Sequence, residues 1–321
     1  MKLPRARGQV SAALIDKIGG EGAALPVAPV FDDEDDLQLT LFVCYELAYR
    51  GWDGVDDAWE WDPDLLRLRA AAEAHFENML HALVRPPSPI DPATVPARLA
   101  ALVAADDGPA LSGYLRGRAT RAQFREFVTH RSIYQLREAD PHSWAIPRLE
   151  GRPKAALIEI QLDEYGGGAV DRMHQELFKQ TMRWFDLDLA YGAYVDTVGA
   201  ATLATNNLMS LFGLHRRHRG ALIGHLAAYE MTSCLPNRAY GNGLRRLGGD
   251  PRATAYYDEH VEADAVHAQI AAHDLCGSFA RAEPELAGDV LFGARSALAL
   301  DACWARAVLD SWHAGRSSLR P

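Results

Sequence analysis

The stretch of sequence that decides the fold is His260-Val261-Glu262-Ala263-Asp264-Ala265-Val266-His267. On an α-helix, with about 100° between successive residues, His260, Asp264 and His267 fall within roughly 60° of one another. Imidazole nitrogen suits iron, copper or zinc, and a carboxylate between two imidazoles can complete the coordination of a metal ion held between helices. The spacing therefore predicts a helix that contributes one face to a metal site. The alternative is a buried hydrogen-bond network.

A second group of candidate ligands lies earlier in the chain, where Glu159, Asp163 and Glu164 precede three glycines (166–168) and then His174. In an unbroken α-helix, Glu164 and His174 would lie about 15 Å apart along the axis and diverge by about 80°. They could share a compact site if the glycines form a bulge that brings them nearer to a seven-residue spacing. A simple loop between two helices is the other interpretation, and the residues leave both open.

Two single acidic residues lie in helical segments that are otherwise mainly apolar. Glu138 ends the segment 133–139, and Glu230 lies within the segment 221–234. A buried carboxylate is costly unless it is paired, whereas a glutamate at a helix end is usually solvated. The residues alone do not decide between these roles.

Apolar residues recur at helical spacing in residues 37–49, 65–83 and almost throughout from residue 121 onward. No period-two strand pattern of convincing length and no internal repeat is found. The fold class predicted from this periodicity is all-α, a helical bundle.

The N-terminal part has its own features. The acidic run in residues 31–36 is expected to favour a helix start through the helix dipole, and Trp59 and Trp61 are expected to pack against neighbouring helices. Five prolines in residues 86–96 break the chain and mark a candidate subdomain seam. We therefore expect additional N-terminal helices before the main bundle.

The composition narrows the class of protein. The chain has 321 residues and a formal charge of −10, and no stretch is basic enough to neutralise a phosphate backbone, so neither nucleic acid nor a membrane is an expected partner. Its four cysteines show no CxxC spacing, which argues against a disulfide framework and a zinc site. No run approaches the roughly 18 apolar residues of a membrane span. The expected location is the cytoplasm.

Three motifs carry a resemblance to a known family: Leu136-Arg137-Glu138-Ala139-Asp140-Pro141-His142, Glu159-Ile160-Gln161-Leu162-Asp163-Glu164-Tyr165-Gly166-Gly167-Gly168 with His174 after it, and the stripe from His260 to His267. Through them the chain resembles the iron-containing redox enzymes, also called heme-oxygenase-like diiron oxidases. Residues 45–51 and 59–61 are similar to segments of longer family members. The resemblance thus extends over nearly the whole chain.

The resemblance implies a set of seven iron ligands: Glu138, Glu164, His174, Glu230, His260, Asp264 and His267. Glu230 rests mainly on its position before His260, and Glu262 and Glu159 are the nearest substitutes. Four carboxylates would balance the charge of two Fe(II) ions. The implied cofactor is therefore a pair of irons. No organic cofactor is predicted, because no Rossmann-type glycine pattern accompanies a βαβ unit.

The implied architecture is a heme-oxygenase-like diiron helical domain over residues 111–321 with an N-terminal helical extension, residues 1–110, packed on its core. The implied activity is that of a non-heme diiron oxidase or oxygenase. It would use dioxygen to oxidise a small amine or amino-acid-like metabolite in specialised metabolism, by N-oxygenation, desaturation or oxidative C–C cleavage.

The other expected partners are a separate electron donor and a second copy of the chain, with which it would form a homodimer. Arg131, Tyr134 and Tyr165 are candidates for a polar substrate pocket, with packing or support of the ligands as the alternative role. The competing hypotheses for the whole protein are a non-catalytic metal-binding protein and a metal-free protein of the same architecture.

Overall fold

The computed structural model describes residues 1–22, 24–31 and 33–321, and the side chains of Asp264 and Ala265 lie outside the described part. Every regular element within these residues is a helix, as the sequence predicts. The α-helices are α1 (Gln9–Ile18), α2 (Glu34–Glu46), α3 (Pro63–Leu83), α4 (Val95–Ala104), α5 (Leu111–Gly117), α6 (Arg121–Gln135), α7 (Asp140–Ser143), α8 (Gly151–Glu164), α9 (His174–Trp184), α10 (Ala200–Leu214), α11 (Arg219–Thr232), α12 (Cys234–Arg246), α13 (Pro251–Gln269), α14 (Ser278–Ala282) and α15 (Ala287–His313).

Short 3-10 helices and one π-helix join these elements. The 3-10 helices are η1 (Asp57–Trp61), η2 (Pro92–Thr94), η3 (Ile146–Arg148), η4 (Gly166–Gly168), η5 (Val170–Arg172), η6 (Val195–Thr197), η7 (Arg216–His218) and η9 (Pro284–Leu286). The π-helix is η8 (Ile270–Gly277), and it continues α13 without a break. No helix in the described residues has both the length and the hydropathy needed to cross a membrane.

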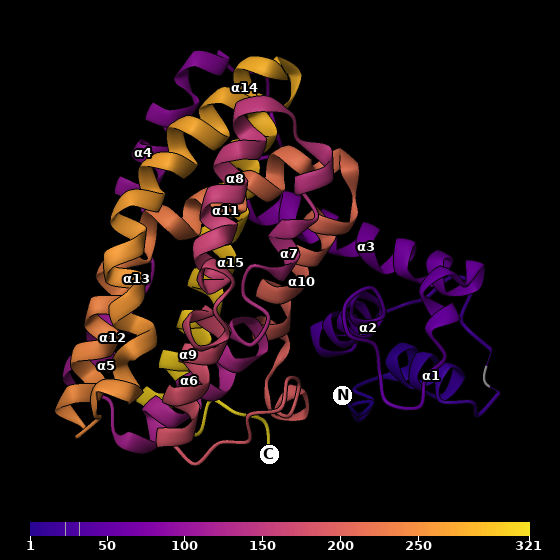
Figure 1. Ribbon diagram of the computed structural model, residues 1–321. Helices are drawn as coiled ribbons and strands as arrows, with labels where there is room; N and C mark the ends of the chain where they lie inside the picture. Colours follow the sequence, from indigo (N-terminus) through magenta and orange to yellow (C-terminus); the bar gives the residue numbers. More distant parts are fainter. Residues whose placement is uncertain (23, 32) are drawn as a thin grey trace.

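The N-terminal helices α1 and α2 lie to one side of an elongated bundle formed by the later helices (Figure 1). Helix α2 packs against α10, whereas α4 lies within the bundle against α11, α15 and η8. The separation of residues 1–110 from residues 111–321 as an extension and a domain remains a prediction.

The acidic residues before α2 start that helix, as expected. Asp33 caps α2 by accepting a hydrogen bond from the Asp36 amide at 2.9 Å. The Asp36 carboxylate in turn accepts from the amides of Val10 and Ser11 at 3.1 and 2.8 Å, so it caps α1. Asp32 lies outside the described residues. One carboxylate therefore fixes the two N-terminal helices to each other.

The two tryptophans of η1 differ. Trp59 packs against the apolar cluster around α1 and α2, as expected. The expectation is wrong for Trp61, whose surface is 73% exposed. The two residues lie on a single turn of 3-10 helix that has no buried residue, so this short element can turn only one of its large side chains toward the core.

Helices α11 and α15 pack closely against each other. Gly224 and Gly293 lie where the two backbones meet, and a Cβ at either position would overlap the other helix at Val290 or Ala221. Glycine is required there because only hydrogen fits between the backbones. This contact fixes α11, the helix that carries Glu230.

Helix α13 packs against α9, α11 and α12, and its continuation η8 packs against α8. The helix thus runs past both α9 and α8, the two helices that flank the three glycines. The face of α13 that carries the histidines therefore contacts helices from different parts of the sequence.

Candidate metal centre

Six of the seven predicted ligands come together in the interior of the bundle. The first ligand group is Glu138, Glu164, His174 and His260, whose ligand atoms all lie within 4.8 Å of one another. The second ligand group is Glu164, Glu230 and His267, whose ligand atoms also lie within 4.8 Å of one another. Glu164 belongs to both groups, so one carboxylate lies between two clusters of potential metal ligands.

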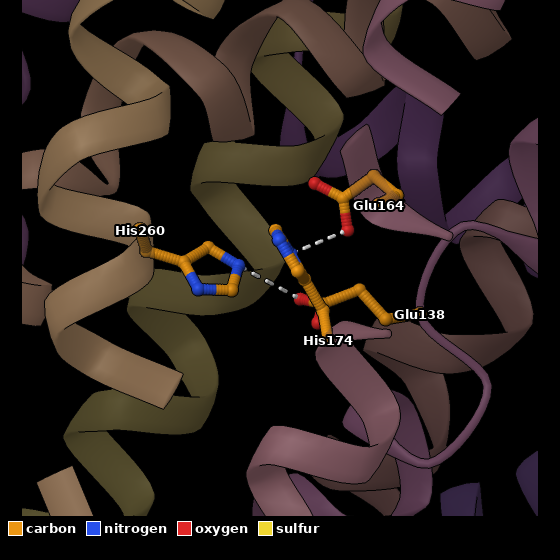
Figure 2. A group of neighbouring side chains, drawn as sticks. All are labelled: Glu138, Glu164, His174 and His260. Carbon is orange, nitrogen blue, oxygen red and sulfur yellow. Dashed lines mark ion pairs between the residues drawn. The ribbon is translucent and has the colours of Figure 1, made fainter. Parts of the chain in front are cut away.

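Figure 2 shows how the first group is assembled: His260 reaches in from α13, and the other three side chains approach it from the opposite side. His260 Nε2 lies 3.6 Å from Glu138 Oε1, and the imidazole rings of His260 and His174 have their centroids 4.4 Å apart. All four side chains are buried or nearly so. The four side chains are thus largely removed from bulk solvent.

Glu138 lies in a tight turn between α6 and α7, not on a helix as the sequence suggested. The reason is Ala139, which adopts φ 68°, in the left-handed region that a side chain disfavours. Gln161 of α8 donates a hydrogen bond to the Ala139 carbonyl at 3.0 Å and so supports this turn. Backbone strain of this kind costs of order 1–3 kcal/mol and is common beside functional residues.

Glu164 and His174 meet although the helix between them is fully broken. Helix α8 ends at Glu164 and α9 begins at His174, and the connection consists of η4 and η5. The interpretation as a bulge is wrong and the loop interpretation is right, because Gly166, Gly167 and Gly168 have φ of 63°, 60° and 84°. His174 Nδ1 nevertheless lies 3.0 Å from Glu164 Oε2.

His260 is oriented by its own helix. Its Nδ1 donates to the backbone carbonyl of Tyr256 at 2.8 Å, which leaves Nε2 facing Glu138 as the atom that would ligate a metal. The Tyr256 hydroxyl donates to Glu138 Oε1 at 2.6 Å. Tyr256 therefore supports two members of the first group, and sequence reasoning missed it. Its position four residues before His260 was the available signal.

In the second group, His267 lies between two carboxylates. Its Nδ1 is 3.3 Å from Glu230 Oε2 on α11, and its Nε2 is 2.9 Å from Asp163 Oδ2 on α8. This arrangement leaves Nδ1 toward the ligand group and directs Nε2–H to Asp163. A carboxylate behind a ligating histidine fixes its tautomer and ring orientation. Asp163 belongs to the acidic cluster before the three glycines, but its role behind His267 could not be predicted from the sequence.

The side chain of Asp264, the remaining predicted ligand, lies outside the described residues. The two substitutes for Glu230 do not join either ligand group: Glu262 and Glu159 are both exposed. Of the three candidates, Glu230 is the one whose carboxylate lies beside His267.

The carboxylates and imidazoles of the centre shift one another's pKa values. Burial acts to raise the pKa of Glu164, but the imidazoles of His174, His260 and His267 outweigh it and lower that pKa to about 2. Burial acts to lower the pKa of His267, whereas Glu230 and Asp163 raise it to about 9. Glu164 thus stays ionised near neutral pH, and a cation bound here would displace the imidazole protons.

The donor atoms fit a metal. Four buried ligand atoms make no hydrogen bond of good geometry within the described part of the chain, although the last three of them face an oppositely charged group: Glu138 Oε2, Glu164 Oε2, His174 Nδ1 and His267 Nδ1. Unsatisfied buried polar atoms cost about 1–3 kcal/mol each, more when charged, and coordination removes that cost. Carboxylate oxygen and imidazole nitrogen are donors that iron accepts.

A cavity of about 140 Å³ adjoins the centre. Of the ligand groups, Glu138, Glu164, Glu230 and His260 line it. Arg131 and Tyr134, two candidates for a polar substrate pocket, also line it. Tyr165 does not, and its hydroxyl instead donates to Asp140 at 2.8 Å. The faces of both ligand groups therefore open onto one space.

Comparisons with known proteins agree with this arrangement. The model of the iron-containing redox enzyme family matches residues 125–302, which is more than half of the chain; the N-terminal motifs lie outside the match. A nitrosourea synthase from Streptomyces achromogenes subsp. streptozoticus is 26% identical over 136 residues, covering 42% of this chain and only 29% of the synthase.

A solved structure gives the fold. A CADD-like protein of unknown function from Nostoc punctiforme superposes with a TM-score of 0.53 at 18% identity, over 67% of this chain and 95% of that chain. The predicted heme-oxygenase-like helical fold is thereby confirmed. With its fold, its ligand groups and the match over residues 125–302, the chain belongs to the family of iron-containing redox enzymes.

Proposed function

We propose that this protein is a non-heme diiron oxygenase that uses dioxygen to oxidise a small amine or amino-acid-like metabolite. The observation that carries the proposal is the pair of ligand groups joined by the shared carboxylate of Glu164. A carboxylate held between two sets of ligands is suited to bridge two metal ions. The family supports iron as the metal.

The charge of the centre favours two ions over one. Glu138, Glu164 and Glu230 supply three carboxylates, and Asp264, predicted as the seventh ligand, would supply a fourth. Four negative charges balance two Fe(II) ions, whereas a single ion would leave an excess of buried negative charge. Glu138, His174 and His260 would hold one iron, Glu230, Asp264 and His267 the other, and Glu164 both.

Two ferrous ions would supply the electrons with which dioxygen is activated. The protein itself orients the ligands and provides the path by which substrate would reach them. Tyr256 fixes the Glu138 carboxylate and the His260 ring, so these ligands are oriented before the metal binds. His174 and His267 do not line the cavity, whereas Glu138, Glu164 and Glu230 do, so substrate would approach the centre past these carboxylates.

N-oxygenation is the reaction we favour, because the similar segment of the nitrosourea synthase belongs to a protein whose name describes chemistry at nitrogen. Desaturation and oxidative C–C cleavage are the alternatives, since one metal site serves all three and substrate placement selects among them. We also propose that reducing equivalents come from a separate donor and that the reaction belongs to specialised metabolism.

Anaerobic loading with Fe(II) tests the proposal. We expect two irons per chain, followed on mixing with dioxygen by oxygen consumption and a transient visible absorption. Fewer than two irons would overturn the diiron proposal, and no bound iron would favour a metal-free protein. Two irons that do not react with dioxygen would favour a non-catalytic metal-binding protein.

A further inference from the structure

A buried ion pair joins the N-terminal helices to the turn that carries Glu138. Arg137 Nη1 donates to the carboxylate of Glu46, the last residue of α2, with 2.5 Å between Nη1 and Oε1. The exposed fraction is 1% for the Arg137 side chain and 0% for that of Glu46. The Tyr191 hydroxyl donates to the same carboxylate oxygen at 2.7 Å. The two charges are therefore enclosed, and each is compensated by the other.

An ion pair in this setting adds little to stability by itself. Both charges lose their hydration when they are buried, and apolar side chains of similar volume often give an equally stable or more stable protein. Removing one partner alone, by contrast, is strongly destabilising, because a buried charge is then left uncompensated. What distinguishes this pair is the arrangement that it fixes, between α2 and the turn at residues 136–139.

Two consecutive side chains of that turn contact different helices. Arg137 contacts α2 and α10: its guanidinium lies 4.7 Å from the centre of the Tyr49 ring, and its Nη2 lies 3.4 Å from Ser210 Oγ. The next side chain, Glu138, contacts α13, where Tyr256 donates to it. Because successive Cα atoms are only about 3.8 Å apart, a displacement of Arg137 moves the backbone from which Glu138 projects. The place of this ligand thus depends on where α2 holds the arginine.

The turn needs such support because its backbone is strained. Ala139 has a positive φ, a conformation that persists in a residue with a side chain only where the surroundings hold it. Gln161 holds the Ala139 carbonyl from one side. Arg50, four residues beyond α2, donates to the Leu136 carbonyl at 3.2 Å. The N-terminal segment therefore fastens the first residue of the turn as well as its arginine.

Arg50 also reaches the sequence neighbours of two further ligands. Its Nη2 lies 3.4 Å from Asp140 Oδ2 and 3.5 Å from Gln175 Oε1, and Asp140 Oδ1 accepts from the Tyr165 hydroxyl at 2.8 Å. Tyr165 and Gln175 are the residues that directly follow the glutamate of α8 and the histidine of α9 in the first ligand group. Each ligand of that group from outside α13 therefore has a near neighbour in this network.

We propose that Glu46 and Arg50 are positioning residues of the metal centre, which act through Arg137 and the turn at residues 136–139 on the carboxylate of Glu138. Both precede residues 125–302, the range that the family model matches, so the N-terminal helices become part of the iron-binding structure. The inference rests on the proposed function, because the first ligand group must bind a metal for its ligands to need positioning.

A double variant that removes both charges tests the buried pair. Glu46→Gln with Arg137→Met leaves no charge buried alone and keeps an acceptor for Tyr191, so we expect the metal-free chain to unfold at a similar urea concentration. The iron affinity of the first group should fall about 10- to 100-fold, the range found for residues that orient metal ligands. The titration is made in the Glu230→Gln background, where the first group keeps all its ligands and the second does not.

Arg7→Met is the matched control, because Arg7 also ties the N-terminal helices to the later part of the chain. Its Nη1 lies 3.1 Å from Asp35 Oδ1, and its Nη2 donates to the Val198 carbonyl at 2.8 Å. We expect this variant to unfold at a lower urea concentration and yet to keep the iron affinity of the first group. An equal loss of affinity in the control would mean that any loosening of the N-terminal helices weakens the site, and would overturn the positioning role.

Arg50→Gln gives a second test that leaves the buried pair intact. The Arg50 side chain is 43% exposed, so its loss should not prevent folding. We expect a smaller loss of iron affinity, up to about tenfold. The visible absorption of Co(II) bound in place of iron should also change, because it reports the coordination geometry. Arg67→Gln, whose side chain is 71% exposed on α3, is the control and should change neither.

Unchanged iron affinity and unchanged Co(II) absorption in the double variant and in Arg50→Gln would overturn the positioning role. If the double variant does not fold, Arg50→Gln decides alone. The iron count of the unaltered chain tests the proposed function separately. Two irons with unchanged affinity in the variants overturn only the positioning role, whereas a single iron whose affinity falls in the variants overturns only the diiron proposal.

Discussion

The two ligand groups differ in what lies behind their histidines. His260 donates to the carbonyl of Tyr256 on its own helix, and Tyr256 also donates to Glu138, so the support of the first group is buried. His267 donates to Asp163, whose side chain is 59% exposed. The second group thus depends on a contact that water can reach.

This difference has an energetic consequence. A backbone carbonyl one turn away cannot leave its histidine unless the helix unwinds, whereas an exposed carboxylate is screened by salt and competes with water. The ligands of the first group are therefore more fully oriented before a metal binds. Such preorganisation raises affinity, because less conformational entropy is lost on binding. We expect the first group to bind iron more tightly than the second.

The largest effect is expected when the shared ligand is removed. In Glu164→Gln both ligand groups lose a carboxylate, so we expect iron stoichiometry to fall from two to less than one per chain, measured after anaerobic loading. Glu159→Gln, on the exposed face of the same helix, is the matched control and should retain two irons. Two tightly bound irons in Glu164→Gln would show that this carboxylate is no bridge.

The second-largest effect is expected from a substitution that removes a ligand from only one of the two ligand groups. Glu230→Gln should lose the iron of the second group and keep that of the first, giving about one iron per chain, because Glu230 belongs to only one group. Glu262→Gln serves as control, since Glu262 is exposed on α13. If the control loses the iron and Glu230→Gln keeps both, the assignment of Glu230 is wrong.

Removing the supports tests the comparison itself. Tyr256→Phe should weaken iron binding at the first group and Asp163→Ala at the second, each within the range of about 10- to 100-fold that such supports contribute. The buried support should have the larger effect, because its loss leaves a carboxylate oxygen unsatisfied. The measurement is stepwise iron affinity under anaerobic conditions; an effect of Asp163→Ala equal to that of Tyr256→Phe would contradict the ranking.

The parts of the metal centre that depend only on local helix geometry could be predicted from the sequence. His260 and His267 face the centre together because helical spacing alone determines which residues share a face. The meeting of Glu164 and His174 was expected only for a bulge, since the path of a chain through three left-handed glycines depends on tertiary packing. Asp163 and Glu164 are neighbours that point in different directions, and spacing could not tell which one faces the ligands and which one supports His267.

The smallest effect at the metal centre is expected from the glycine connection. A Cβ at Gly166 would lie 2.5 Å from the carbonyl carbon of Arg172 and 2.6 Å from the amide nitrogen of Met173, whereas a Cβ at Gly168 would meet nothing within 4 Å. Both glycines have positive φ. Gly168→Ala should therefore cost about 1 kcal/mol of unfolding free energy, and Gly166→Ala about 3 kcal/mol, because backbone strain and overlap add.

The same pair of variants connects the turn to the first ligand group. Met173 directly precedes His174, so the displacement forced by Gly166→Ala should also shift His174 and lower iron affinity at that group, while Gly168→Ala should leave the affinity unchanged. Urea denaturation and iron titration of both variants give the two readouts. Equal destabilisation by the two substitutions would mean that the connection relaxes around Gly166, and that His174 is held by α9 and its contacts with α13 instead of by the glycine turn.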